Sequence, residues 1–268
     1  MTGAAGGLSA VPDYPPGHGL LRDRTVVVTA AAGTGIGFAT ARRCVEEGAR
    51  VLMSDVHERR LGEAAEALAA LPGASGPPVT FRCDVTVEAD VQGLIDAARS
   101  EFGRLDVLVN NAGLGGTAEL VDMTDEQWGR VMDITLNGTF RVTRAALRLM
   151  RDQGSGVIVN NASVLGWRAQ AGQAHYAAAK AGVMALTRCA AVEAAAYGVR
   201  VNAVAPSLAM HPFLAKVTTE ELLEELTGRE AFGRAAEPWE VANVIVFLAS
   251  QYSSYVTGEV VSVSSQHP

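Results

Sequence analysis

The sequence predicts an α/β fold with a doubly wound, seven-stranded parallel sheet that is covered by helices on both faces. Short apolar runs alternate with segments of helical period along the 268 residues. Neither a Pro/Ser-rich linker nor an internal repeat interrupts this alternation. Continuously apolar strands separated by helices are typical of a parallel sheet buried on both faces. Right-handed crossovers between such strands then give the doubly wound arrangement.

Each expected strand is a short run rich in Val and other apolar residues. The strands are expected at residues 25–30, 51–54, 79–83, 105–113, 156–163, 199–206 and 259–264. The expected helices show amphipathic or Ala-rich patterns, and several stop at Gly or at Pro-Gly. They are expected at about 36–48, 58–71, 87–103, 125–152, the Ala-rich stretch from 174, and 238–249.

The alternation indicates one catalytic domain, residues 22–268, preceded by an N-terminal arm. The arm, residues 1–21, is rich in Pro and Gly, so we expect it to be disordered or draped on a neighbouring surface. Residues 207–236 break the rhythm and contain a helical piece of their own, TTEELLEEL. A long insertion after the carboxyl end of a strand is usually functional, so we expect a substrate lid there.

The composition argues against several classes of protein. A net charge of −7 gives no basic footprint for nucleic acid. No apolar run is long enough to span a membrane, and the N-terminus lacks a secretory signal pattern, so we expect a cytoplasmic protein. Three scattered cysteines and five histidines without ligand spacing predict neither a disulfide framework nor a metal site.

A Gly-rich turn follows the first strand in TVVVTAAAGTGIG. Gly33, Gly35 and Gly37 precede and open a helix, where backbone N–H groups can bind a pyrophosphate; a tight turn without a ligand needs the same residues. Asp55 ends the next strand, 18 residues after Gly37. A carboxylate there can accept hydrogen bonds from a ribose, and a solvated strand-end carboxylate is the alternative.

The strongest chemical signal is SVLGWRAQAGQAHYAAAK. Tyr176 and Lys180 are four residues apart and share a helix face, and Ser163 ends a strand 13 residues before Tyr176. Lys180 is one of only two lysines beside 20 arginines. A nearby ammonium lowers the pKa of a tyrosine, which can then exchange a proton with an alcohol or ketone while the serine fixes its oxygen. The alternative is a buried tyrosine and a surface lysine on an Ala-rich helix.

These motifs resemble the short-chain dehydrogenase/reductase family, in its classical type. The resemblance spans residues 22–264 and includes the Gly-rich turn, LDVLVNNAG, the Ser–Tyr–Lys set, VRVNAVAP and YVTGEVVSV. It implies a Rossmann fold and a nicotinamide dinucleotide cofactor, NAD rather than NADP because of Asp55. The residues it implies for cofactor binding are Gly33, Gly35, Ile36, Gly37, Asp55, Asp84, Val85, Asn111, Ala112, Gly113, Tyr176, Lys180, Pro206 and Leu208.

The chain departs from the family pattern at four places, and one of them is the C-terminal stretch, which reads SVSSQHP where the family often has VDGG. The Gly-rich turn is one residue longer, with Ala30 or Ala31 where the first glycine is expected. Thr135 stands where many members have a catalytic Asn that supports a proton relay; a Thr hydroxyl can bond an i−4 carbonyl and distort the helix. After VNAVAP, Ser207 replaces a glycine and His211 falls where a cofactor-contacting Thr is usual.

The expected substrate pocket is apolar and bulky, which favours a hydrophobic alcohol or ketone. Its candidate substrate-binding residues are Leu165, Trp167, Met210, His211 and Phe213, with Leu114, Val164, Leu208 and Leu214 as further lining, although any of these can instead be core. Arg168, Lys216 and Arg234 are candidates for contact with a phosphate-bearing carrier at the rim, or are simply solvated.

Further segments resemble a branch of the family found in bacterial steroid degradation. They are HERRLGE, NNASVLGWRAQ and the tail YSSYVTGEVVSVSSQHP. That branch acts on bicyclic acids carried as CoA thioesters. One alternative is a 3-oxoacyl-thioester reductase acting on an acyl-carrier-protein or CoA substrate. An alternative of another class is a non-catalytic dinucleotide-binding sensor or scaffold.

The Ala-rich helix and the 125–152 helix resemble the four-helix subunit interface of the family. Eleven alanines between Ala174 and Ala196 allow close helix approach. We therefore expect a homotetramer, or at least a dimer, and a monomer in light scattering would contradict this.

Overall fold

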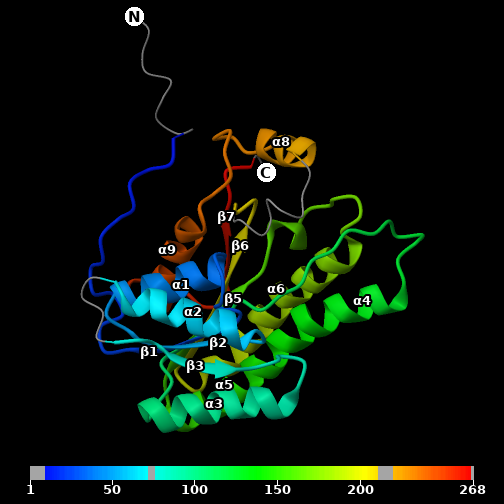
Figure 1. The fold of residues 1–268 in the computed structure, drawn as a ribbon. Helices are drawn as coiled ribbons and strands as arrows, with labels where there is room; N and C mark the ends of the chain where they lie inside the picture. Colours follow the sequence, from blue (N-terminus) through cyan, green and yellow to red (C-terminus); the bar gives the residue numbers. More distant parts are fainter. Residues whose placement is uncertain (1–9, 72–75, 211–219, 267–268) are drawn as a thin grey trace, which may run out of the picture.

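The computed structural model describes residues 10–71, 76–210 and 220–266, and only the backbone of 220–222. These residues form a seven-stranded sheet in the order β3-β2-β1-β4-β5-β6-β7, with every neighbouring pair parallel (Figure 1). The predicted fold class is confirmed. The strands are β1 (Thr25–Val28), β2 (Arg50–Asp55), β3 (Val79–Arg82), β4 (Val107–Asn110), β5 (Gly156–Asn161), β6 (Val199–Pro206) and β7 (Val260–Val263).

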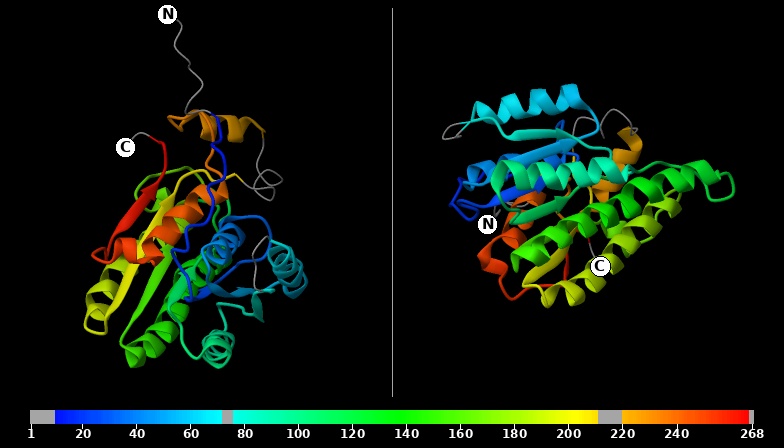
Figure 2. Two further views of the ribbon diagram at one scale, coloured as in Figure 1. Left: turned by 90° about the vertical axis from the view of Figure 1, so that its left-hand side faces the viewer. Right: turned by 90° about the horizontal axis from the view of Figure 1, so that it is seen from below.

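Helices cover both faces of the sheet (Figure 2). They are α1 (Ile36–Glu46), α2 (Glu58–Ala69), α3 (Glu88–Phe102), α4 (Asp125–Met132), α5 (Gly138–Gln153), α6 (Ala174–Ala195), α8 (Glu220–Gly228) and α9 (Pro238–Ala249), with single turns η2 (Val164–Gly166) and η3 (Gln251–Ser253). Val26 and Val28 pack in one core cluster with residues of α1, α2 and α9. Val27 packs in a second cluster, with residues of α3, α5 and α6. Both side-chain directions of β1 are therefore buried, which explains its unbroken apolar sequence.

The order of the strands brings the predicted site residues to one edge. The chain moves outward from β1 to β3, then returns to place β4 on the other side of β1. In a parallel sheet the loops after all strands leave from the same edge, and the point where the order reverses is where ligands bind. The segments after β1, β2, β4, β5 and β6 therefore share the carboxyl edge.

The expected long helix is interrupted. Residues 125–153 run as α4, a five-residue π-helix η1 (Asp133–Asn137) and α5. The N–H of Gly138 donates to the carbonyl of Asp133, five residues back. The Thr139 hydroxyl donates to the Thr135 carbonyl at 2.8 Å. The sequence predicted such a bond to an i−4 carbonyl for Thr135. The structure shows it for Thr139.

The described part of the arm is tied to the first helix. Arg43 and Glu47 form a buried ion pair at 2.7 Å at the end of α1. Arg43 also donates to the carbonyls of Pro15 and Pro16, and Glu47 accepts from the backbone N–H groups of His18 and Leu20. The arm therefore supplies the backbone partners that a buried ion pair needs, and it lies on this chain's own surface.

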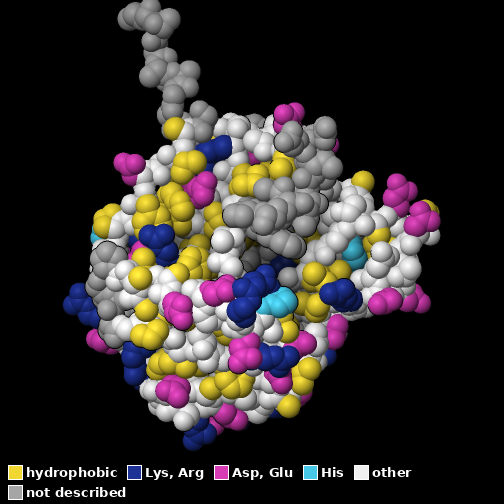
Figure 3. All heavy atoms as spheres, in the orientation of Figure 1, with side chains coloured by type: hydrophobic (Ala, Val, Ile, Leu, Met, Phe, Trp, Pro, Cys, Tyr) yellow, Lys and Arg dark blue, Asp and Glu magenta, His cyan; other side chains and the backbone are white. Residues whose placement is uncertain are grey.

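The surface shows no single-sign patch on the face drawn in Figure 3, where acidic and basic side chains are interspersed. Within the described ranges, no helix combines the length and the apolar character that crossing a bilayer requires. The same ranges contain no cluster of three or more His, Cys, Asp or Glu side chains suited to a metal ion.

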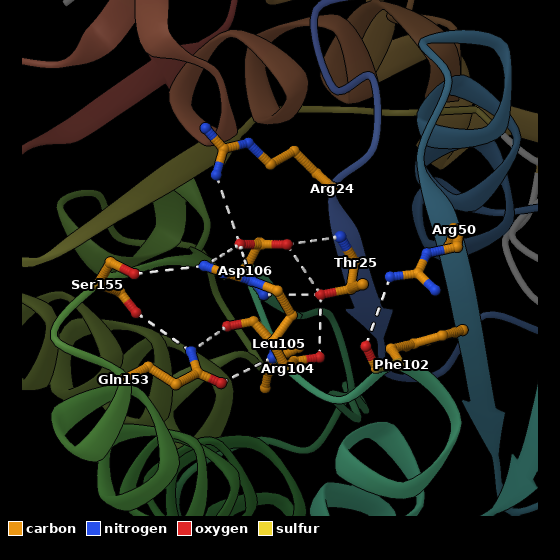
Figure 4. A network of polar contacts seen from close by, with 9 residues as sticks. All are labelled: Arg24, Thr25, Arg50, Phe102, Arg104, Leu105, Asp106, Gln153 and Ser155. Atoms are coloured by element: carbon orange, nitrogen blue, oxygen red, sulfur yellow. Dashed lines mark hydrogen bonds and ion pairs between the residues drawn. The ribbon is translucent and has the colours of Figure 1, made fainter.

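A polar network fixes the opposite, amino-terminal edge of the sheet (Figure 4). The buried carboxylate of Asp106 accepts from the Thr25 N–H at 2.9 Å and from the Thr25 hydroxyl at 3.0 Å. Arg104 donates to the same carboxylate at 2.8 Å, and Arg24 lies 3.4 Å away. This carboxylate joins the start of β1 to the start of β4.

Replacing Asp106 with Ala should lower the free energy of unfolding by about 2–4 kcal/mol, because buried donors lose their charged acceptor. Urea denaturation measures the change. Arg24→Ala is the matched control: the Arg24 side chain is 41% exposed, so its ion pair contributes at most about 1 kcal/mol. Equal stability of the two variants would contradict a structural role for the network.

Candidate active site

The Gly-rich turn has the backbone that an anion site needs. Gly33 has φ of +98°, which requires glycine, and a Cβ on Gly37 would lie 2.2 Å from the Ala30 carbonyl oxygen. Within the described chain, the N-terminus of α1 has no side-chain cap and no acidic residue in its first turn. Its N–H groups therefore fit the negative charge of a pyrophosphate.

Ala30 is the residue that stands in for the expected first glycine. Its φ is +50°, a left-handed conformation that is rare for residues with a Cβ and costs roughly 1 kcal/mol. The sequence left Ala30 and Ala31 open, and the structure distinguishes them: Ala31 is fully buried in the core and is not among the residues with positive φ.

Asp55 lies beside this turn, at the carboxyl end of β2. Its Oδ2 accepts from the Ala32 N–H at 3.2 Å and its Oδ1 from the His57 N–H at 3.0 Å. Partial burial raises the pKa of Asp55, and the Ala32 N–H and the Arg60 charge oppose that rise. The Asp55 carboxyl group is therefore held against the Gly-rich turn by the backbone.

The turn after β3 is held by Asp84. Its carboxylate accepts from the Thr86 hydroxyl at 2.7 Å and from the Thr86 N–H at 2.9 Å, and these bonds lower its pKa. The next residue, Val85, is buried, and a Cβ on Gly138 would lie 2.6 Å from it. The local sequence thus fixes this turn against α5.

The segment after β4 lies beside β1. The Thr29 hydroxyl accepts from the N–H groups of Asn111 and Ala112, and the Asn111 side chain donates to the Ala30 carbonyl at 3.1 Å. A Cβ on Gly113 would lie 3.4 Å from Lys180 Nζ. The NNAG motif therefore connects the Gly-rich turn to the Lys180 side chain.

Ser163, Tyr176 and Lys180 lie together, as the sequence predicts. Ser163 follows β5, and its side chain lies close enough to Tyr176 to oppose the rise in the tyrosine pKa. The Ser163 hydroxyl also accepts from the Leu165 N–H at 3.2 Å. Lys180 Nζ lies 5.5 Å from the centre of the Tyr176 ring. It donates to the Asn161 carbonyl at 2.5 Å.

The electrostatics of this trio differ from the sequence expectation. Burial raises the pKa of Tyr176 to about 12, and the Ser163 hydrogen bond opposes only part of that rise. Burial also lowers the pKa of Lys180 to about 8. The expected lowering of the tyrosine pKa by the ammonium was wrong for the protein alone, because desolvation of the two groups dominates.

Thr135 lies in the π-helix and is fully buried. Its hydroxyl donates to the Leu114 carbonyl at 3.1 Å and accepts from the Leu114 N–H at 3.0 Å. A side chain that exchanges both bonds with a loop residue fixes that loop. Asn137 does not replace it, since its amide donates to Asp133 on the exposed side of the helix.

Of the expected substrate-binding residues, Leu165 and Met210 are half-buried and Trp167 is 51% exposed. Val164 is buried. Pro206 ends β6 in the core, and Leu208 follows it half-buried. The expectations for His211, Phe213, Leu214 and Lys216 lie outside the described residues.

A cluster of hydrogen bonds at the base of residues 207–236 was not predicted from the sequence. We use the name Glu230 clamp for Glu230 with Leu208, Ser265 and Gln266. The buried Glu230 carboxylate accepts from the Leu208 N–H, from the Ser265 N–H and hydroxyl, and from the Gln266 amide. Only the departure of the tail SVSSQHP from the family pattern pointed to this region.

The two described arginines of the expected rim have protein partners. Arg234 forms two bonds with Glu240, at 2.7 and 2.8 Å, which raise its own pKa and lower that of Glu240. Arg168 donates to the side chain of Gln266. Neither guanidinium is simply solvated. Arg168 is bound to the C-terminal segment through Gln266, and Arg234 is bound to the helix α9 through Glu240.

Comparison with known proteins agrees with this geometry. A family model described as enoyl-(acyl carrier protein) reductase, of the short-chain alcohol dehydrogenase type, matches residues 30–265. The chain is 65% identical over 262 residues to the (5R,7aS)-5-hydroxy-7a-methyl-1-oxo-2,3,5,6,7,7a-hexahydro-1H-indene-carboxyl-CoA reductase of Mycobacterium tuberculosis, covering 97% of this chain and 99% of the relative.

Solved structures of short-chain dehydrogenases and reductases have the same fold as this chain. A short chain dehydrogenase from Mycobacterium smegmatis superimposes with a TM-score of 0.87 at 59% identity, covering 98% of this chain and all of that one. A variant actinorhodin polyketide ketoreductase with NADPH gives 0.85 at 33% identity, covering 91% of this chain and 96% of that one. The chain therefore belongs to the short-chain dehydrogenase/reductase family of oxidoreductases, which bind a nicotinamide dinucleotide.

Proposed function

We propose that the protein transfers a hydride between NAD and a secondary alcohol or ketone on a bicyclic, steroid-derived CoA thioester. The observation that carries the chemistry is the contact of Ser163 with Tyr176 beside the buried Lys180. The substrate class is supported by the similarity to the indene-carboxyl-CoA reductase, which extends over nearly the whole of both chains.

The dinucleotide site that we propose lies along the carboxyl edge. The uncapped N-terminus of α1, with Gly33, Gly35, Ile36 and Gly37, would hold the pyrophosphate. Asp55 would hold the adenosine ribose and disfavour a 2′-phosphate, and Asp84 and Val85 would face the adenine side. Asn111, Ala112, Gly113, Pro206 and Leu208 would line the remainder.

The residues of the carboxyl edge would hold a nicotinamide dinucleotide, which would supply or take up the hydride. Ser163 hydrogen-bonds the reacting oxygen and fixes its place. Tyr176 gives its phenolic proton to that oxygen during reduction, or takes it during oxidation. Lys180, when charged, stabilises the phenolate that forms. Thr135 acts by holding the Leu114 backbone next to this group.

Two further features of the protein remain predictions. Trp128 of α4, Phe140 of α5 and Val192 of α6 are exposed apolar side chains on the helices expected to form the subunit interface, which supports a homotetramer. All three cysteines are free thiols, which supports a reducing, cytoplasmic compartment.

The first test follows reduced-cofactor formation with NAD and NADP, on a bicyclic hydroxy-acid CoA thioester and on a linear 3-hydroxyacyl thioester. We expect turnover of the bicyclic compound with NAD. Asp55→Asn should raise kcat/KM for NADP about tenfold, since a repulsion of roughly 1.4 kcal/mol is removed while an acceptor for Ala32 remains. Preference of the wild-type protein for the linear thioester would favour a general 3-oxoacyl-thioester reductase.

Tyr176→Phe should lower kcat by about 10²–10⁴-fold, because the proton donor and acceptor is lost. Its dinucleotide Kd, measured by fluorescence, should change little. Tyr197→Phe, just beyond the far end of α6, is the matched control and should retain full activity. A Tyr176→Phe variant that turns over normally would exclude the proposed role of Tyr176.

Activity should depend on pH in opposite senses for the two directions. Alcohol oxidation releases a proton, so its kcat/KM should rise with pH. Ketone reduction needs protonated Tyr176, whose pKa is about 12, and charged Lys180, whose pKa is about 8. Its kcat/KM should be constant at low pH and fall above about pH 8.

Initial rates from pH 6 to 10, measured in both directions, give the two profiles. Lys180→Arg keeps a positive charge throughout this range, so the fall in ketone reduction near the lysine pKa should disappear even if the rate itself is lower. The same fall in both proteins would show that Lys180 does not cause it.

A further inference from the structure

A chain of hydrogen bonds runs across the carboxyl edge, from the Gly-rich turn to the proposed catalytic lysine. The Ala30 carbonyl accepts from Asn111 Nδ2 at 3.1 Å. Asn111 Oδ1 accepts from Asn161 Nδ2 at 2.9 Å. The Asn161 carbonyl in turn accepts from Lys180 Nζ at 2.5 Å. Four separate segments, those after β1 and β4, the end of β5 and the helix α6, are joined in this way.

The first member of this chain is held in an unfavourable conformation. Ala30 has φ of +50°, and a peptide in that conformation persists when its surroundings fix it. The Asn111 amide binds the Ala30 carbonyl, and the absence of a side chain on Gly37 leaves room for both: a Cβ there would lie 2.5 Å from Asn111 Nδ2.

Asn161 is the member that joins the two ends. Its side-chain N–H₂ orients Asn111, and its carbonyl receives the Lys180 ammonium. Its Oδ1 is buried and has no partner among the described residues. An apolar residue of similar size would fill the same space in the sheet, but it would not orient Asn111. The amide is therefore needed for position and not for packing.

We propose that Asn161 is a positioning residue that couples the strained Ala30 turn to Lys180, so that dinucleotide affinity depends on its amide. The proposal rests on the dinucleotide site argued above and not on the identity of the substrate. The dependence arises because Ala30, unlike glycine, does not readily adopt a positive φ without support. Replacing Ala30 with glycine should therefore reduce the effect of the Asn161 amide on dinucleotide affinity.

A double-mutant cycle tests this coupling. In the wild-type background, Asn161→Leu should raise the Kd for NAD about tenfold, the scale of one or two lost hydrogen bonds. In the Ala30→Gly background, the same change should raise Kd only about threefold. Calorimetry without substrate measures each Kd, so a wrong substrate assignment would not affect the result.

Ala32→Gly gives the matched control background, because Ala32 lies in the same turn and is not among the residues with positive φ. There Asn161→Leu should keep its full effect. Asn161→Ser, whose side chain is too short to span to Asn111, covers the case in which the leucine variant does not fold. Urea denaturation of each variant without cofactor separates affinity from stability.

Three results would overturn the proposal. The first is an unchanged Kd in Asn161→Leu or Asn161→Ser. The second is an equal increase in the Ala30→Gly and Ala32→Gly backgrounds. The third is a loss of stability with no loss of affinity, which would make Asn161 a purely structural residue. Failure of the wild-type protein to bind NAD or NADP would instead count against the proposed function.

Discussion

The burial of the Lys180 ammonium is the constraint on which the site depends. Lys180 is 3% exposed. Its removal from water disfavours the charged form and lowers its pKa to about 8. Its hydrogen-bond acceptor in the described structure is a backbone carbonyl, that of Asn161. A carboxylate partner would stabilise the ammonium, but it would also neutralise the charge that could otherwise stabilise a Tyr176 phenolate. A neutral acceptor leaves the lysine charge available to a phenolate, and the strand ends around it provide the rigid frame.

Much of the fold could be predicted because its signals are local. Continuously apolar strands such as TVVV, helices that stop at glycine, and the spacing of Tyr176 and Lys180 need no knowledge of distant residues. The meeting of Ser163 with Tyr176 follows from the sheet, since the strand that ends near Ser163 and the following helix α6 belong to one crossover unit. The family resemblance implied the Rossmann fold, whose doubly wound parallel sheet the structure has.

The remainder depends on contacts between segments far apart in the chain. The sequence allowed either Ala30 or Ala31 at the position of the first glycine, because the choice depends on where Asn111 lies. It placed the helix distortion on the Thr135 hydroxyl, which instead bonds to Leu114, while Thr139 bonds the helix carbonyl. It treated Arg168 and Arg234 as rim charges because Gln266 and Glu240 come near them only in the folded chain. The pKa of Tyr176 depends on burial by several segments at once.

The π-helix has a consequence for how this chain can change in length. Asp133–Asn137 contains the extra residue that a π turn inserts into an α-helix, and each residue of a helix corresponds to about 100° of rotation. Deleting one residue here would let the segment close as an ordinary α-helix, so α4 and α5 would keep the faces that they now pack. The contact between Thr135 and Leu114 is the one that such a deletion would change. Surface loops accept insertions and deletions because nothing downstream is rotated by them. The π turn gives this helix a similar tolerance for a change of one residue in length.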